Sequence, residues 1–109
     1  MISETPLRKA IQVAATLAGA RLFRNNTGRL QDKTGRWVTF GLGVGGSDLI
    51  GFTAEGLFCA IEIKVGRTPV TVEQRRFISS VNAAGGRAGV ARSVEDALAI
   101  LTDGNGGIM

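Results

Sequence analysis

The stretch CAIEIKVG, residues 59–66, has the composition of a buried β-strand, yet it carries Glu62 and Lys64. Side chains alternate between the two faces of a strand, so the apolar residues at odd positions share one face and the two charged residues share the other. Two opposite charges on one face of a strand have two interpretations. They form either an ion pair on a solvated surface or part of a functional site.

Length and composition favour one globular domain. The chain has 109 residues, which suffice for one hydrophobic core and are too few for two. We predict a single domain over residues 1–103 and a loose tail over residues 104–109, GNGGIM. The apolar segment 11–20 is too short to span a membrane, and no basic segment with a cleavage site precedes it. We therefore expect a cytoplasmic protein without a membrane partner.

The residues that the chain lacks exclude several kinds of chemistry. The sequence has no His and no Tyr, which rules out Ser-His-Asp hydrolysis, imidazole bases and a phosphotyrosyl mechanism. Its single cysteine, Cys59, excludes an internal disulfide and a cysteine-built zinc site, and we expect it in the core. The formal net charge of +4 favours polyanionic partners such as nucleic acid.

Hydrophobic periodicity and turn residues predict an α/β chain with the order α-β-β-β-α-β-α. The predicted helices cover residues 3–18, 71–84 and 93–103, and the predicted strands cover residues 20–26, 47–53, 57–65 and 87–91. The segment RLQDKTGRWVTF, residues 29–40, is interpreted as a hairpin or a long excursion that turns at Thr34-Gly35. Its Trp37 is interpreted as a core residue or an anchor of the excursion, with a stacking platform as the alternative.

The hairpin around residues 54–56 sets a register that brings two carboxylates together. If these residues form a three-residue loop with Gly56 in the left-handed conformation, the numbers of paired residues sum to 110. Asp48 then lies opposite Glu62, with the two Cβ atoms about 5 Å apart. A two-residue loop would instead place Asp48 on the opposite face from Glu62.

Two carboxylates and an ammonium on one face fit a bound divalent cation better than a purely structural sheet. Mg²⁺ prefers oxygen ligands and is typically held by one or two carboxylates together with a substrate phosphate. The backbone carbonyl of Ile63 can supply another oxygen, and Lys64 can orient a water molecule or stabilise developing negative charge. A site of this composition is suited to phosphodiester hydrolysis.

The segments GGSDLIG (45–51) and AIEIKVG (60–66) resemble the PD-(D/E)XK nuclease signature, in which an Asp and a Glu-x-Lys on successive strands hold the catalytic metal. More narrowly, the chain resembles the virus-type replication-repair nuclease family, VRR-NUC, over nearly its whole length. The segments that carry this resemblance are FRNNTG (23–28), GGSDLIGF (45–52), FCAIEIKVGRTPVTVEQRRFI (58–78) and AGGRAGVARSVEDAL (84–98). Ser47 stands where the family signature usually has Pro, a residue that shapes the backbone and is not a ligand.

The resemblance implies a restriction-endonuclease-like PD-(D/E)XK fold, a mixed sheet flanked by helices, and a metal-dependent DNA endonuclease. It implies a set of ligands for Mg²⁺ or Mn²⁺, which are Asp48, Glu62, the carbonyl of Ile63 and, on the first helix, Glu4. Lys64 and Gln74 would complete the catalytic site. The family's free-standing members further imply a homodimer that acts on branched DNA such as four-way (Holliday) junctions, and a viral or prophage origin in a bacterial host.

Several of these residues also have an ordinary structural interpretation. Asp48 alone can end a turn, Gln74 can complete a capping box with Thr71, and Glu4 can complement the dipole of the first helix. The predicted DNA contacts, which a solvated loop or helix surface would equally explain, are Arg24, Asn26, Arg67 and Arg75. The alternative functions are a non-catalytic nucleic-acid-binding module on the same fold and a scaffold domain.

Overall fold

The computed structural model describes residues 3–43 and 45–103, and the predicted tail at 104–109 lies outside these ranges. The helices are α1 (Glu4–Leu17), α2 (Val72–Ala83) and α3 (Val94–Asp103), and the strands are β1 (Arg21–Arg24), β2 (Gly28–Gln31), β3 (Trp37–Phe40), β4 (Leu49–Phe52), β5 (Phe58–Ile63) and β6 (Arg87–Ala91). Without β2 and β3, which pair only with each other, this order is the predicted α-β-β-β-α-β-α.

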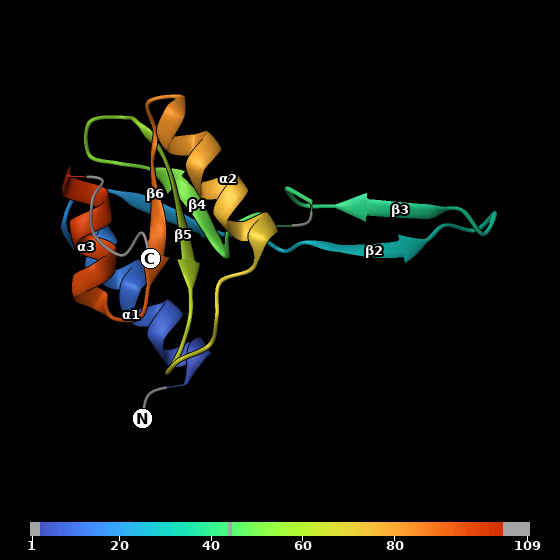
Figure 1. The fold of residues 1–109 in the computed structure, drawn as a ribbon, viewed down its shortest axis with the longest axis horizontal. Coiled ribbons are helices and arrows are strands. Elements are labelled where there is room, and N and C mark those ends of the chain that lie inside the picture. The colour runs from blue at the N-terminus through green and yellow to red at the C-terminus, as the bar shows by residue number, and fades with distance from the viewer. Residues whose placement is uncertain (1–2, 44, 104–109) are drawn as a thin grey trace.

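The main sheet is mixed and lies between helices (Figure 1). Its strand order is β1-β4-β5-β6, in which β1 with β4 and β4 with β5 are antiparallel and β5 with β6 is parallel. Helices α1 and α3 pack on one face of the sheet, and α2, which connects the two parallel strands, packs on the other. The predicted fold class, an α/β domain with a mixed sheet flanked by helices, is confirmed.

Side-chain alternation along β5 supplies both hydrophobic clusters. Cys59, Ile61 and Ile63 belong to the cluster beneath α1 and α3, whereas Ala60 belongs to the smaller cluster beneath α2. Cys59 is fully buried, as expected, and burial raises the pKa of its thiol to about 11. Because both faces of β5 are covered, Glu62 lies inside the protein with 4% of its surface exposed. A buried carboxylate is costly unless it has partners.

The helix boundaries largely agree with the prediction. Ser3 occupies the N-cap position of α1, but its side chain makes no capping hydrogen bond. The buried stripe of α1 consists of Leu7, Ile11 and Ala15. These residues lie four positions apart on the face of the helix that packs against the sheet and α3. No helix among the described residues is long and apolar enough to cross a bilayer.

The segment 28–40, called the arm below, is a hairpin that projects from the body of the protein (Figure 1). It turns at Gly35, whose φ of 88° is the left-handed conformation expected at the predicted Thr34-Gly35 turn. No helix or other strand of the described chain contacts β2 or β3. Trp37 is therefore 60% exposed, and its interpretation as a core residue is wrong.

Candidate active site

The β4–β5 hairpin has the predicted register. Leu49 pairs with Ile61, and every pair along the two strands sums to 110. Gly56 has a φ of 88°, the left-handed conformation that the three-residue loop requires. This register places Asp48, which directly precedes β4, beside Glu62 near the end of β5.

Asp48 is held between two neighbouring strands. Its Oδ2 accepts a hydrogen bond of 2.8 Å from the backbone N–H of Ile63, and its backbone carbonyl accepts one of 2.8 Å from Asn25. The side chain of Asn25 also donates to the backbone carbonyl of Ser47 at 3.0 Å. Asn25 lies directly after β1 in the segment FRNNTG, and its observed role is to position the Asp48 backbone.

The two oxygens of the Glu62 carboxylate have different surroundings. Oε2 accepts a hydrogen bond of 3.0 Å from Nε2 of Gln74 and lies 3.8 Å from Nζ of Lys64. Oε1 is buried and has no hydrogen-bond partner. A buried oxygen without a partner retains the full cost of its lost hydration, so it is a place where a cation would be stabilised.

The surroundings of Glu62 disfavour its negative charge. Burial, followed by the negative charge of the neighbouring Asp48, raises the pKa of Glu62 from 4.5 to about 8. Lys64 opposes this shift, and the more distant Glu4 adds to it. The lysine therefore compensates only part of the negative charge that Asp48 and Glu62 would carry together.

Gln74 both caps helix α2 and contacts Glu62, the two alternatives that the sequence left open. Its Oε1 accepts from the backbone N–H of Thr71, and its own N–H donates to the Thr71 hydroxyl, which completes the capping box of α2. Its Nε2 simultaneously donates to Glu62. The start of α2 thus positions the buried carboxylate as well as the helix.

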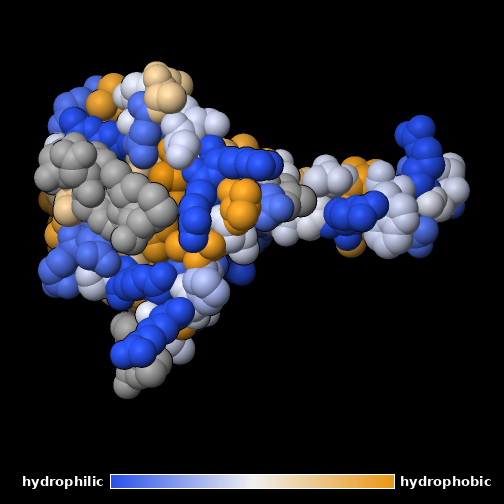
Figure 2. Space-filling view, viewed as in Figure 1, coloured by the Kyte–Doolittle hydropathy of each residue, from blue (hydrophilic) through white to orange (hydrophobic). Residues whose placement is uncertain are grey.

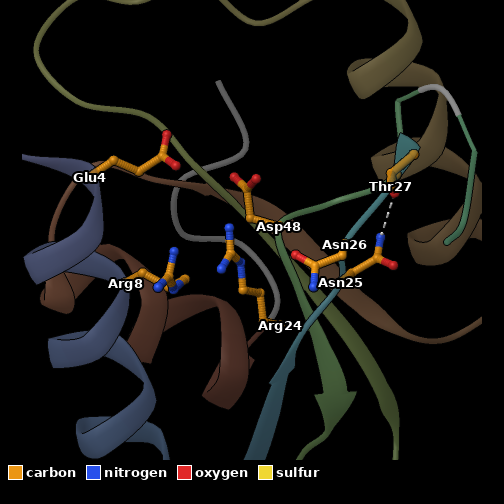
Figure 3. Close-up of a pocket in the computed structure, with 8 residues that line it drawn as sticks. Glu4, Arg8, Arg24, Asn25, Asn26, Thr27 and Asp48 are labelled. Atoms are coloured by element: carbon orange, nitrogen blue, oxygen red, sulfur yellow. Dashed lines mark hydrogen bonds between the residues drawn. The ribbon is translucent and has the colours of Figure 1, made fainter. Parts of the chain in front are cut away.

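A cavity of about 220 Å³ lies beside Asp48 (Figure 3). Its lining consists of Glu4, Arg8, Arg24, Asn25, Asn26, Thr27, Gly46 and Asp48. Figure 3 shows the guanidinium groups of Arg8 and Arg24 extending into the space between α1 and Asp48. Three predicted site residues, Glu4, Arg24 and Asn26, therefore share one pocket with Asp48.

Arg8 is a candidate residue that the sequence interpretation missed. Its Nε is buried without a hydrogen-bond partner, and the ion pairs of the described chain include neither Arg8 nor Arg24. The available signal was its place one turn after Glu4 on the same face of α1. Two guanidinium groups without carboxylate partners in one pocket are suited to bind a phosphate.

Arg67 and Arg75 lie elsewhere on the surface. Arg67 is exposed in the loop between β5 and α2, and Arg75 is exposed near the start of α2. Neither lines the cavity beside Asp48. Arg92 fixes the loop that carries Arg67, because its guanidinium donates to the carbonyls of Gly66 and Thr68 at 3.0 and 2.8 Å.

The donor set fits a hard divalent cation. Residues 3–43 and 45–103 contain no cluster of three His, Cys, Asp or Glu side chains able to hold a metal ion. The available oxygens are those of Asp48, the unpartnered Oε1 of Glu62 and nearby backbone, and Mg²⁺ sites commonly combine one or two carboxylates with water and substrate oxygens. Glu4 faces Asp48 from the α1 side of the cavity (Figure 3).

The family model of the VRR-NUC domain matches residues 14–95 of the chain. The matched region contains Asp48, Glu62, Lys64 and Gln74, and it begins after Glu4. No curated protein matches the chain.

Proposed function

Because the chain belongs to the VRR-NUC family, we propose that it is a metal-dependent endonuclease that hydrolyses phosphodiester bonds in branched DNA such as four-way junctions. Membership of this family makes it a nuclease-type DNA-processing domain. The observation that most supports a working site is the buried, unpartnered Oε1 of Glu62 beside Asp48. We place the protein in the cytoplasm of a bacterial host, as a viral or prophage product.

Asp48, Glu62 and the carbonyl of Ile63 would hold Mg²⁺ or Mn²⁺, with Glu4 as a further ligand from α1. When bound, such an ion polarises a phosphoryl oxygen and makes a coordinated water more acidic. The backbone N–H of Ile63 fixes the orientation of Asp48, and Gln74 fixes that of Glu62. Both carboxylates are thus preorganised by neighbours that are themselves part of regular structure.

The cations of the site have separate roles in this proposal. Lys64, with 12% of its side chain exposed, stabilises the negative charge that develops on the phosphate during attack. Arg8, Arg24 and Asn26 bind a substrate phosphate in the cavity beside Asp48. Arg67 and Arg75, which lie outside the cavity, contact the DNA backbone further from the cut.

A substrate panel tests the proposed function. The purified protein is incubated with labelled linear, flap and four-way-junction DNA in Mg²⁺, in Mn²⁺ and in EDTA. We expect metal-dependent incision of the junction and none in EDTA. Junction binding without cutting in either metal would favour the non-catalytic nucleic-acid-binding module, and a protein that neither binds nor cuts DNA would favour the scaffold domain.

Changing Gln74 to Ala should reduce both stability and cleavage. The loss of the capping hydrogen bond to the Thr71 backbone N–H costs about 1 kcal/mol of unfolding free energy, and the loss of the hydrogen bond to Glu62 lowers the cutting rate by about tenfold or more. Thr71→Ala is the matched control, because it removes the other hydrogen bond of the same capping box without touching Glu62. Thermal melting and single-turnover rates are measured for both variants. Equal rates in the two variants would leave Gln74 with only its capping role.

We also propose that the active form is a homodimer. A four-way junction has two strands to cut, and a domain with one active site needs a two-fold-related partner to make paired incisions. Light scattering should therefore give about twice the chain mass of 11.4 kDa, alone or with junction DNA. A monomer under both conditions would favour an enzyme that nicks DNA or cuts flaps.

A further inference from the structure

We propose that the arm, residues 28–40, binds the DNA duplex that flanks the cut, an inference that rests on the proposed endonuclease function. In the described chain the arm has no packing partner, and it extends into solvent from the body (Figure 1). Figure 2 shows strongly hydrophilic and hydrophobic residues side by side along it.

The arm is rooted in the wall of the candidate active site. Its first strand begins directly after Thr27, which lines the cavity beside Asp48. Its second strand returns at Gly41, whose φ is 81°, and a Cβ there would collide with the backbone oxygen of Asn26. The arm therefore leaves and re-enters the body at the pocket, so DNA held in the pocket passes close to it.

The strand pairing gives the arm two different faces. Because Arg29 pairs with Thr39 and Gln31 pairs with Trp37, these residues share the face that we call the polar arm face. The opposite face, called the apolar arm face, consists of Leu30, Val38 and Phe40.

The polar arm face carries the chemistry that binds nucleic acid. The guanidinium of Arg29 lies 4.8 Å from the centroid of the Trp37 ring, and both residues are exposed. An exposed indole beside a guanidinium offers a surface for stacking bases and a cation for phosphate. The arm has three cations, Arg29, Lys33 and Arg36, and one carboxylate, so its formal charge is 3 − 1 = +2.

The single carboxylate of the arm, on Asp32, is already used within the turn. It accepts from the backbone N–H groups of Thr34 and Arg36 at 2.9 and 3.0 Å and from the Thr34 hydroxyl at 2.6 Å. The Thr34 hydroxyl and the other turn hydrogen bonds hold the pKa of Asp32 below its ordinary value. Asp32 therefore stays ionised at neutral pH and pairs with Arg36 at 3.6 Å, so the net charge of the arm stays at +2, which is complementary to a DNA backbone.

The dimensions of the arm match a duplex. A two-stranded ribbon is narrow enough to enter the major groove. The Gln31–Trp37 pair lies four residues beyond Thr27, which at about 3.3 Å per residue is roughly 13 Å from the pocket. That distance corresponds to about 4 base pairs of duplex.

A second copy of the chain is a less suitable binding partner for the arm than DNA. The apolar arm face has three side chains, which are 65%, 46% and 40% exposed. Their remaining exposed surface falls well short of the roughly 800 Å² per partner that a stable interface buries. A homodimer would therefore need surface from the body of the protein.

The test compares variants of the two arm faces by DNA binding in EDTA, where no cutting occurs. We expect the double variant Arg29→Ala/Trp37→Ala to bind four-way-junction DNA about tenfold or more weakly. The slope of log affinity against log salt concentration should fall by about 1, the amount that one phosphate contact contributes. The matched control, Leu30→Ala/Val38→Ala, should bind like the wild type. Hydroxyl-radical footprints should lose protection about 4 base pairs from the centre of the bound region and keep it at the centre.

Lys33→Glu, in the exposed turn of the arm, is a second variant that touches no packed residue and should also weaken binding. Wild-type affinity in this variant and in Arg29→Ala/Trp37→Ala would overturn the inference. So would weaker binding only in the apolar-face control together with a lower mass in light scattering, because the arm would then be a protein interface. A wild type that binds DNA through the arm but cuts no DNA in any metal would instead refute the proposed endonuclease function and retain the arm inference.

Discussion

Replacing Glu62 with Gln, or Asp48 with Asn, will lower DNA cleavage by about 10³-fold or more and leave a folded protein that still binds DNA. Both substitutions keep the shape of the side chain and remove the negative charge that a divalent ion requires. Since Gln74 and Ile63 can still donate to the new amide oxygens, the local structure should persist. Lys64→Ala should abolish cutting as well, because it removes the ammonium nearest to Glu62.

The matched control for these variants is Glu95→Gln, which neutralises an exposed carboxylate in the first turn of α3, outside the cavity beside Asp48. It should cut at the wild-type rate. The measurement is a single-turnover rate on junction DNA in Mn²⁺, with affinity determined separately in EDTA. Asp48→Asn protein that cuts at the wild-type rate, in a preparation free of contaminating nuclease, would contradict the assignment of the site.

In EDTA, the stability of the wild type should fall as pH rises from about 4.5 to about 8. Glu62 has an ordinary pKa of 4.5 and a pKa of about 8 in the folded protein. Below pH 4.5 the Glu62 carboxyl is protonated in both the folded and the unfolded state, so it does not change the free energy of unfolding. Between the two values the unfolded chain releases the proton while the folded chain retains it, so the free energy of unfolding decreases with pH.

Glu62→Gln should remove most of this pH dependence and raise the melting temperature above that of the wild type at pH 8, although most substitutions destabilise. In the wild type, Mn²⁺ at about a hundred times its dissociation constant adds roughly 2.7 kcal/mol, a rise on the order of 10 °C for a domain of this size. The rise should be larger at pH 8 than at pH 6, because the ion competes with a proton for Glu62. The variant should lose most of it.

Thermal scans of both proteins across pH, with EDTA and with a Mn²⁺ titration, decide this prediction. Glu95→Gln again serves as the control and should follow the wild type, since its carboxylate is exposed. If Glu62 served only as the buried ion-pair partner of Lys64, Glu62→Gln would destabilise the protein at every pH, and Mn²⁺ would shift neither protein.

The sheet and the carboxylate pair were predictable because they depend on local rules. Alternation along residues 59–66 separates the apolar face from the charged face, and a three-residue loop ending at Gly56 sets the register. Together these rules place Asp48 beside Glu62 without knowledge of the rest of the fold. The family resemblance independently implied the same two residues as metal ligands, and the family match supports the assignment of the fold.

The features that could not be predicted depend on how distant elements meet. Trp37 is a large aromatic residue of the kind usually found in a core. It is exposed because no described helix or other strand packs on the arm. Whether Gln74 caps a helix or reaches Glu62 depends on where α2 starts above β5, and the structure allows both. Arg8 gained its candidate role only when α1 packed beside the loop that carries Asp48.

The most direct test of the metal site is a crystal of the protein grown or soaked with Mn²⁺ and measured for anomalous scattering. We predict an anomalous peak in contact with the carboxylates of Asp48 and Glu62 and with the carbonyl of Ile63, and its absence in a Glu62→Gln crystal treated in the same way. A wild-type crystal in which Mn²⁺ binds elsewhere, or leaves Asp48 and Glu62 without a peak at saturating concentration, would contradict the proposed site.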